Sequence, residues 1–211
     1  MTVRFEKIIP LPMLEQDTSG SEIWEADSLS FEQGKSYLIE AASGRGKTSL
    51  LSIIFGLRKD YRGKAFIDDN DINSLTGKQW SGLRKYELAF IFQGLELFND
   101  MTALENIRLK NAITRHKTTQ EIREMADRVG IAPFLNRKAG ILSFGQQQRV
   151  AIIRALCQPF SFMLADECFS HIDQENSLKA FALIREECMK QGAGLIMTSL
   201  NGTSNLQFDY R

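Results

Sequence analysis

The sequence predicts an α/β protein with a mostly parallel sheet that is divided by an inserted helical segment. Short apolar runs typical of buried strands occur in both halves of the chain, and helical patterns follow them. Between the two halves, from residue 94 to about residue 158, the pattern is helical throughout. The ends of this insertion, near Gln93 and Pro159, are therefore the expected internal boundaries of a single domain of residues 1–211.

The first elements are predicted from the alternation of apolar and polar residues. Residues 3–9 and 22–31 alternate as strands do, and the polar stretch 17–20 between them has the composition of a turn. The apolar run 36–41 predicts a buried strand, and residues 46–57 predict a helix directly after it.

The later elements alternate between strands and helices. A short strand at 65–67 ends in the turn signal 68–71. Thr102 and Glu105 have the spacing of a capping box, which predicts the start of a helix. Further helices are expected at 119–129, 145–156 and 174–190, and further strands at 88–92, 160–165 and 194–198.

The composition is that of a soluble globular protein and gives no sign of a basic nucleic-acid binder. The 211 residues are 43% hydrophobic and 25% charged, and 26 basic residues balance 26 acidic ones. Cys157, Cys168 and Cys188 have no CxxC spacing, which favours buried thiols in a reducing compartment. Without a signal-peptide pattern or a membrane-length apolar run, the chain is expected to be cytosolic.

A glycine-rich loop between the strand 36–41 and the helix 46–57 predicts a phosphate-binding site. Glycines let successive backbone N–H groups converge on one anion, and the N-terminus of the helix adds a positive field. Lys47 can reach the outer phosphates, and the Thr48 hydroxyl can bind Mg²⁺. Ala41 replaces the first glycine of the usual spacing, and the alternative is an ordinary glycine loop that caps a helix. The expected phosphate contacts are Ala42, Ser43, Gly44, Arg45, Gly46, Lys47, Thr48 and Ser49.

Two adjacent carboxylates, Asp166 and Glu167, follow the predicted strand 160–165. Ligands of open α/β sheets bind outside the carboxyl ends of the strands, so these side chains are expected near the phosphates. Asp166 would hold Mg²⁺, and Glu167 would polarise the attacking water. The alternative interpretation is a solvated turn after a strand.

A second anion-binding helix start is predicted at residues 142–149. Ser143 is a natural N-cap, and the backbone N–H of Gly145 follows it. A single nucleotide does not need two such helix ends from one chain. A head-to-tail dimer resolves this, with each nucleotide held between the phosphate loop of one copy and this segment of the other.

These motifs, in this order, resemble those of ATP-binding cassette (ABC) ATPases, the nucleotide-binding subunits of ABC transporters. Residues 41–48 match the Walker A motif, and Asp166 and Glu167 match the end of Walker B. Gln93 matches the Q-loop glutamine, and residues 142–146 match the LSGGQ signature. Residues 170–173 match the D-loop, and residues 98–106 are similar to the branch that serves lipoprotein release and macrolide efflux.

The resemblance implies a P-loop NTPase fold. Its RecA-like core, together with an N-terminal antiparallel β subdomain, would comprise residues 1–93 and 159–211. The α-helical subdomain with the signature would comprise residues 94–158.

The resemblance also implies ATP and Mg²⁺ as cofactors and assigns roles to residues of this chain. Two cassettes, identical or homologous, would dimerise around two ATP molecules and drive transmembrane permease subunits from the inner face of the membrane. The implied catalytic residues are Glu167, Lys47, Gln93 and Ser199; the metal ligands are Thr48, Gln93 and Asp166; the signature residues acting in trans are Ser143, Gly145 and Gln146; the D-loop residues are Ser170 and Asp173.

The sequence departs from the family pattern at the position of the switch histidine, where it has Ser199. Serine is shorter than histidine and cannot become cationic, so we expect slow hydrolysis. His171 in the D-loop is one alternative source of an imidazole, although a lone histidine is more often a surface or interface residue.

Two further departures concern the base and the signature. Leu14 stands where family members stack adenine on an aromatic residue, and the nearby Phe5 and Trp24 fit core strands better. Phe144 replaces the first glycine of the signature, a variation that leaves Ser143 and the Gly145 N–H in place.

The function expected from the sequence is therefore an ATPase subunit of an ABC transporter. One alternative is a degenerate cassette that binds ATP and dimerises but hydrolyses little, as Ser199, Leu14 and Ala41 suggest. Another is a soluble ABC-type ATPase outside transport, for which the sequence has neither coiled coils nor zinc modules.

Overall fold

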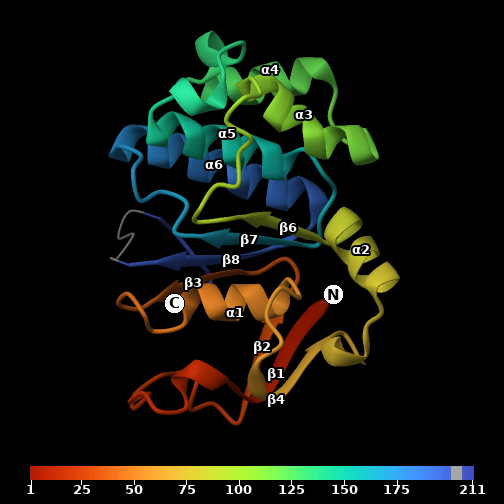
Figure 1. The fold of residues 1–211 in the computed structure, drawn as a ribbon, viewed down its shortest axis with the longest axis vertical. Helices are drawn as coiled ribbons and strands as arrows, with labels where there is room; N and C mark the ends of the chain where they lie inside the picture. The colour runs from red at the N-terminus through yellow and green to blue at the C-terminus, as the bar shows by residue number, and fades with distance from the viewer. Residues whose placement is uncertain (201–205) are drawn as a thin grey trace.

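The computed structural model describes residues 1–200 and 206–211, which form two sheets with helices between and above them (Figure 1). The parallel sheet has the strand order β3-β8-β7-β6. Its strands are β3 (Ser36–Glu40), β6 (Leu88–Ile91), β7 (Phe162–Asp166) and β8 (Gly194–Ser199). Because all four run in the same direction, the residues that follow them meet at one edge of the sheet.

The second sheet is antiparallel and has the order β2-β1-β4-β5. It consists of β1 (Thr2–Pro10), β2 (Ser28–Glu32), β4 (Tyr61–Ile67) and β5 (Asn70–Asp71). Helix α1 (Lys47–Ile54) lies between the two sheets (Figure 1), and its apolar side chains are completely buried there. This packing fixes the N-terminus of α1 relative to both sheets.

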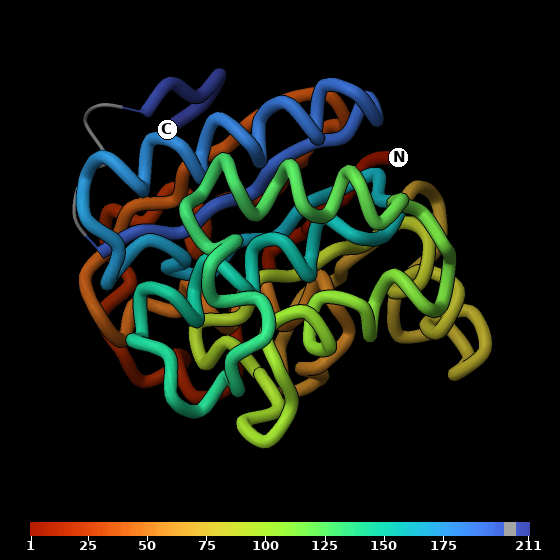
Figure 2. The backbone as a smooth tube through the Cα atoms, turned by 90° about the horizontal axis from the view of Figure 1, so that it is seen from above, coloured from red at the N-terminus to blue at the C-terminus, as the bar shows by residue number. Residues whose placement is uncertain are grey.

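The remaining helices lie on the far side of the parallel sheet, except for α2, which lies at one edge (Figure 1). Helices α5 and α6 cover the sheet, and α3 and α4 form an outer layer, with α4 beside α6 (Figure 2). Their bounds are α2 Gly77–Tyr86, α3 Ala103–Thr114, α4 Thr119–Arg128, α5 Phe144–Leu156 and α6 Gln174–Gln191. Short 3₁₀ helices occur at Leu11–Met13, Ile72–Ser74, Ala132–Phe134 and Ala139–Ile141.

Most helices begin at a residue that the sequence marks. The predicted capping box at Thr102 and Glu105 is confirmed, and Ser143 caps α5 in the same reciprocal way with Gln146. Similar boxes start α2 and α4, and the Asp173 carboxylate caps α6 by accepting a hydrogen bond from the Asn176 N–H.

Two sequence predictions of secondary structure need correction. The strand expected at 22–31 begins only at Ser28, because the hydroxyl of Ser21 accepts hydrogen bonds from the N–H groups of Ile23 and Trp24 and closes a turn there. Helix α2 was not expected, since Gly77 and Gly82 weaken its helical pattern. Its capping box at Thr76 and Gln79 is the signal that marks its start.

Residues near the C-terminus return to the free edge of β3. The Leu38 N–H donates to the Tyr210 carbonyl at 3.0 Å, and the rings of Tyr37 and Tyr210 stack with their centroids 5.0 Å apart. The Asp209 carboxylate accepts hydrogen bonds from the backbone and the hydroxyl of Ser36, which lower the pKa of Asp209. These contacts cover the edge of the parallel sheet beside the phosphate loop.

The three cysteine thiols are buried, as the sequence predicts. Cys157, Cys168 and Cys188 are buried and unpaired, and burial raises the pKa of the Cys157 and Cys188 thiols to about 12. None of the helices in the described part of the chain combines the length and the apolar character that a membrane crossing needs.

Candidate functional site

The glycine-rich loop leaves the end of β3 and enters α1 through backbone conformations that glycine favours. Gly44 and Gly46 have φ values of 79° and 85°. A Cβ at Gly46 would also lie 2.4 Å from the Met13 sulfur and 2.7 Å from the Trp24 ring. The close approach of these two side chains explains why only glycine fits directly before Lys47.

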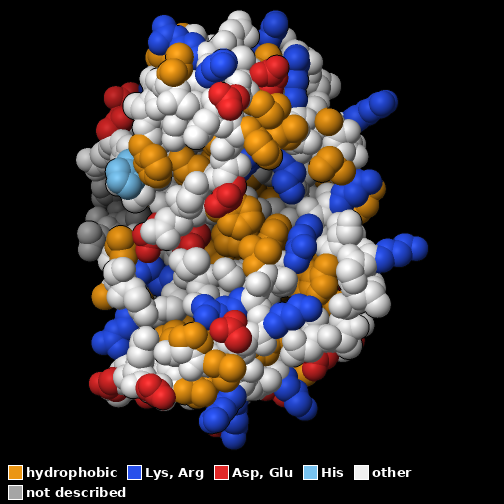
Figure 3. All heavy atoms as spheres, in the orientation of Figure 1, with side chains coloured by type: hydrophobic (Ala, Val, Ile, Leu, Met, Phe, Trp, Pro, Cys, Tyr) orange, Lys and Arg blue, Asp and Glu red, His pale blue; other side chains and the backbone are white. Residues whose placement is uncertain are grey.

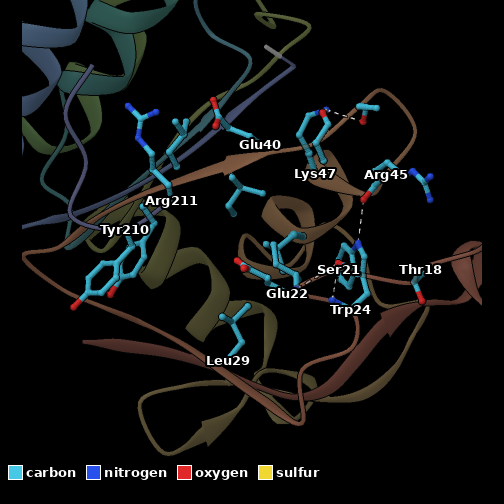
Figure 4. Close-up of a pocket in the computed structure, with 18 of the residues that line it drawn as sticks. Thr18, Ser21, Glu22, Trp24, Leu29, Glu40, Arg45, Lys47, Tyr210 and Arg211 are labelled. Atoms are coloured by element: carbon cyan, nitrogen blue, oxygen red, sulfur yellow. Dashed lines mark hydrogen bonds between the residues drawn. The ribbon is translucent and has the colours of Figure 1, made fainter. Parts of the chain in front are cut away.

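Trp24 supports the loop from outside, a role that the local sequence pattern does not indicate. Its indole N–H donates to the carbonyl of Arg45 at 3.0 Å (Figure 4). The side chain is only partly buried and lies in the turn before β2, whereas Phe5 is a core residue of β1 as expected. Trp24 therefore holds the phosphate loop instead of filling a core strand.

A cavity of about 230 Å³ lies over the loop and brings together the main residues predicted from the sequence. It unites the loop with Gln93 from the segment after β6 and Glu167 from the segment after β7. Its lining residues are Pro12, Met13, Gln16, Ser43, Gly44, Gly46, Lys47, Thr48, Ser49, Arg58, Gln93 and Glu167. The signature residues Ser143, Gly145 and Gln146 are not among them.

Lys47 is the buried cation of this site, with 6% of its surface exposed. Its ammonium donates to the Ala41 carbonyl at 2.5 Å and the Ala42 carbonyl at 3.1 Å, and it lies 3.2 Å from a Glu167 oxygen. The replacement of the first loop glycine by Ala41 leaves its carbonyl free to make this contact. Three oxygens thus satisfy an ammonium that burial would otherwise destabilise.

Glu167 is held from two sides. One oxygen faces Lys47, and the other accepts a hydrogen bond from the Gln93 side-chain amide at 2.9 Å. Its backbone φ is 45°, a conformation that costs a non-glycine residue energy and needs support from its surroundings. That support comes from the Thr198 hydroxyl, which accepts a hydrogen bond from the Glu167 N–H at 3.1 Å.

Thr198 is a site residue that no sequence motif marks. Its hydroxyl donates to an Asp166 oxygen at 2.6 Å, and both residues are almost completely buried. They meet because β7 and β8 are neighbours in a register that pairs Asp166 with Thr198. The strand order is what makes this contact, so the signal was absent from the local sequence.

Of the three predicted magnesium ligands, Thr48 and Gln93 line the phosphate cavity, whereas the buried Asp166 does not. Thr48, Gln93 and Asp166 offer hydroxyl, amide and carboxylate oxygens, the ligands that Mg²⁺ prefers. The described residues contain no cluster of three or more acidic, histidine or cysteine side chains that would form a complete metal site by themselves. Such a sparse set suits a metal that keeps water and nucleotide phosphates as its other ligands.

Ser199 and Leu14 lie at the margin of the site. Ser199 ends β8 opposite Glu40, and its carbonyl accepts a hydrogen bond from the Ala41 N–H at 3.4 Å. Leu14 is 37% exposed and lines neither the phosphate cavity nor the larger cavity of about 820 Å³ beside it. Trp24 and Tyr210 line that larger cavity (Figure 4), and Tyr37 also lines it.

The signature and D-loop residues form a separate unit at the start of α5. The buried Gln148 side chain donates to the Ser170 hydroxyl at 3.1 Å and accepts from the His171 N–H at 3.1 Å. Ser143 is exposed at the helix start. The Asn176 side chain and N–H donate to the Asp173 carboxylate and lower its pKa, so Asp173 acts in this chain as the cap of α6.

Helix α5 is also tied at its other end to the segment that follows Gln93. The Arg154 guanidinium donates to the carbonyls of Leu95 and Glu96. Both of these residues have a positive φ, 61° and 50°, so the loop depends on this support.

Comparison with known proteins shows which family the chain resembles. The family described as "ABC transporter" matches residues 25–170. The lipoprotein-releasing system ATP-binding protein LolD of Syntrophotalea carbinolica is 37% identical over 74% of this chain and 70% of its own length. The ATP-binding protein YtrE of Bacillus subtilis is 32% identical over 81% of this chain and 75% of its own length. The macrolide export ATP-binding/permease protein MacB of Vibrio parahaemolyticus is 32% identical over 75% of this chain but only 25% of its own length.

Solved structures match over almost the whole chain. The dimeric structure of MJ0796, a bacterial ABC transporter cassette, has a TM-score of 0.78 and 26% identity, covering 94% of this chain and 88% of that one. A dimeric post-hydrolysis state of the same cassette, bound to ADP and Pi, has a TM-score of 0.76 and 28% identity with the same coverage. The predicted P-loop NTPase fold, with its antiparallel β sheet and inserted helices, is confirmed. The chain belongs to the ABC transporter family, as one of its ATP-binding cassettes with ATPase chemistry.

Proposed function

We propose that this chain is the motor subunit of an ABC transporter that binds MgATP, pairs head to tail with a second cassette and hydrolyses ATP to drive a permease. The chain is then located at the cytoplasmic face of the membrane, bound to a permease. The single observation that carries the proposal is the convergence of Lys47, Gln93 and Glu167 on the cavity over the phosphate loop. Three separate segments of the chain supply these residues.

We assign the roles at this site from the contacts of each residue. The loop N–H groups and Lys47 bind the β- and γ-phosphates, with Lys47 exchanging Glu167 for phosphate oxygens. Glu167, freed from that ion pair, orients and deprotonates the attacking water, while Gln93 positions its carboxylate. A magnesium ion held by Thr48, Gln93 and Asp166 would neutralise charge on the phosphates.

The second cassette completes the site. Ser143, Gly145 and Gln146 lie at an exposed helix start and do not line the phosphate cavity of their own chain. In a head-to-tail pair, the Ser143 hydroxyl and the Gly145 N–H face the γ-phosphate of the partner copy. The cassette MJ0796, which has a similar fold, is dimeric.

The permease surface proposed here surrounds the segment after Gln93. Exposed apolar side chains occur on the elements next to it: Leu57 after α1, Tyr86 at the end of α2 and Phe98 before α3. Figure 3 shows apolar side chains gathered over the middle of one face, with Lys and Arg around them. We assign residues 94–158 as the helical subdomain that shares this surface, and 1–93 with 159–211 as the core and β subdomain.

The transport branch proposed is the one of lipoprotein release and macrolide export. This proposal is supported by relatives named LolD and MacB, which are 37% and 32% identical to this chain. The cargo pocket lies in the permease, so the cassette itself selects no substrate.

Steady-state ATPase activity tests the proposed chemistry. Wild-type protein is expected to release phosphate from MgATP, and Glu167→Gln is expected to lose about 100-fold or more in kcat because the general base is gone. Unchanged phosphate release by Glu167→Gln would contradict the role of Glu167.

A second candidate, a cassette that binds ATP but scarcely hydrolyses it, is favoured by Ser199. The variant Ser199→His distinguishes the two, since an imidazole at the end of β8 can reach the γ-phosphate. If the wild-type rate is close to zero and Ser199→His raises it at least about tenfold, the missing histidine is the limitation. A rate that stays near zero assigns the limitation to another position.

A further inference from the structure

His171 lies directly against the start of α5, although it belongs to the loop after β7. Its ring packs edge-on against Phe144, with centroids 4.5 Å apart and planes at 73°. Its carbonyl oxygen would lie 2.5 Å from a Cβ at Gly145, so the two backbones are in close contact. The imidazole is therefore held against Phe144 at the same helix start that carries Ser143 and Gly145, the residues assigned above to the nucleotide of the partner copy.

Hydrogen bonds to Gln148 and Ser170 also hold the residue that bears this imidazole. The His171 backbone N–H can only donate, so its partner on Gln148 is the amide oxygen, and the Gln148 amide nitrogen donates to the Ser170 hydroxyl. The Ser170 hydroxyl, 2.9 Å from His171 Nδ1, can then give its own proton to that nitrogen. With Ser170 as the donor in this contact, the proton of the neutral ring is on Nε2, and the side chain is exposed.

We propose that His171 donates a hydrogen bond from Nε2–H to the γ-phosphate bound by the partner copy, and so supplies in trans the imidazole that Ser199 lacks. The inference rests on the proposed head-to-tail pairing. The added donor stabilises negative charge on the transferred phosphoryl group. Phe144 holds the ring, which gives a physical reason for an aromatic residue at this position of the signature.

The first test is the kinetic effect of removing the imidazole. His171→Ala is expected to lower kcat by about 10- to 100-fold with KM changed less than about twofold, because the hydrogen bond strengthens in the transition state. The control is His116→Gln, which removes the other histidine, located between α3 and α4, and leaves the rate unchanged. A wild-type kcat in His171→Ala would overturn the proposal.

The second test asks whether the imidazole acts across the dimer. The variants Glu167→Gln and His171→Ala are each inactive or slow alone. A dimer of one copy of each contains one complete site, in which the His171→Ala copy supplies Glu167 and the Glu167→Gln copy supplies His171. A 1:1 mixture forms mixed pairs in about half of its dimers, so about a quarter of the wild-type rate is expected. If His171 acts within its own subunit or only supports the fold, the mixture shows no gain over its components, and the proposal fails.

A parallel mixture separates this inference from the proposed function. Glu167→Gln mixed with Ser143→Ala regains activity if the composite site exists, whatever His171 does. Gain in this mixture without gain in the His171→Ala mixture overturns the role of His171 alone. Absence of gain in both overturns the head-to-tail site, and with it the role of His171.

Discussion

At the scale of single residues, the site depends on one hydroxyl that connects two strands. Thr198 donates to Asp166 and accepts from the Glu167 N–H, so it positions both carboxylates without facing the phosphate cavity itself. It also supports Glu167 in its left-handed backbone conformation. Thr198 is therefore a buried positioning residue for Asp166 and Glu167.

Replacement of Thr198 is therefore expected to affect stability and activity together. Thr198→Val keeps the shape but leaves a buried acceptor and a buried N–H without their partner, which costs about 1–3 kcal/mol. Urea unfolding measures this loss, and kcat for MgATP is expected to fall as the carboxylates shift. Thr198→Ser is the matched control, because it keeps the hydroxyl and should retain most of both quantities. Equal stability of the Val variant and wild type would contradict this account.

At the scale of elements, α4 lies beside α6 (Figure 2), and the ion pair between Arg128 and Glu186 connects the two helices. Glu186 of α6 lies 2.7 Å from both Arg128 of α4 and Lys190 of α6. Hydrogen bonds from these two cations lower the pKa of Glu186 from 4.5 to about 2. Because 41% of the Glu186 side chain is exposed, solvent screens much of this interaction.

The lowered pKa of Glu186 predicts a specific dependence of stability on pH. A carboxyl whose pKa is lower in the folded state stabilises the fold above its unfolded pKa, and the contribution disappears as pH falls from about 4.5 toward 2. Screening limits the contribution to about 0.5–1 kcal/mol. Unfolding free energies of wild type and Glu186→Gln, measured at several pH values, are expected to differ at neutral pH and to converge in acid. A difference that grows in acid would refute this assignment.

Local sequence patterns predict only part of the candidate site. The phosphate loop, Asp166 and Glu167 could be located because local patterns mark strand ends and helix starts, whereas the role of Gln93 came from the resemblance to ABC ATPases. Thr198 and Trp24 could not, because their contacts arise from strand order and from a turn that packs against a distant loop. Helix α2 was missed since two glycines mask its pattern, although Thr76 and Gln79 mark its start.

At the scale of the whole molecule, the proposed pairing of two copies predicts an association that depends on nucleotide. Glu167→Gln binds MgATP without consuming it, so the γ-phosphate remains to connect the loop of one copy with the signature of the other. Size-exclusion chromatography with light scattering is expected to show monomers without nucleotide and dimers with MgATP. Ser143→Ala in the same background is expected to weaken the dimer, and a persistent monomer in Glu167→Gln with MgATP would argue against the composite site.

The bonds from Arg154 to the carbonyls of Leu95 and Glu96 have a mechanical consequence. Helix α5 has 13 residues, so it is a rigid rod of about 20 Å with Ser143 at one end and Arg154 near the other. A force applied by a neighbouring protein to the segment after Gln93 is thereby transmitted along the rod to the surface that meets the second copy. In the proposed transporter, movement of the permease against this segment and closure of the two cassettes are then coupled through one rigid-body motion of α5.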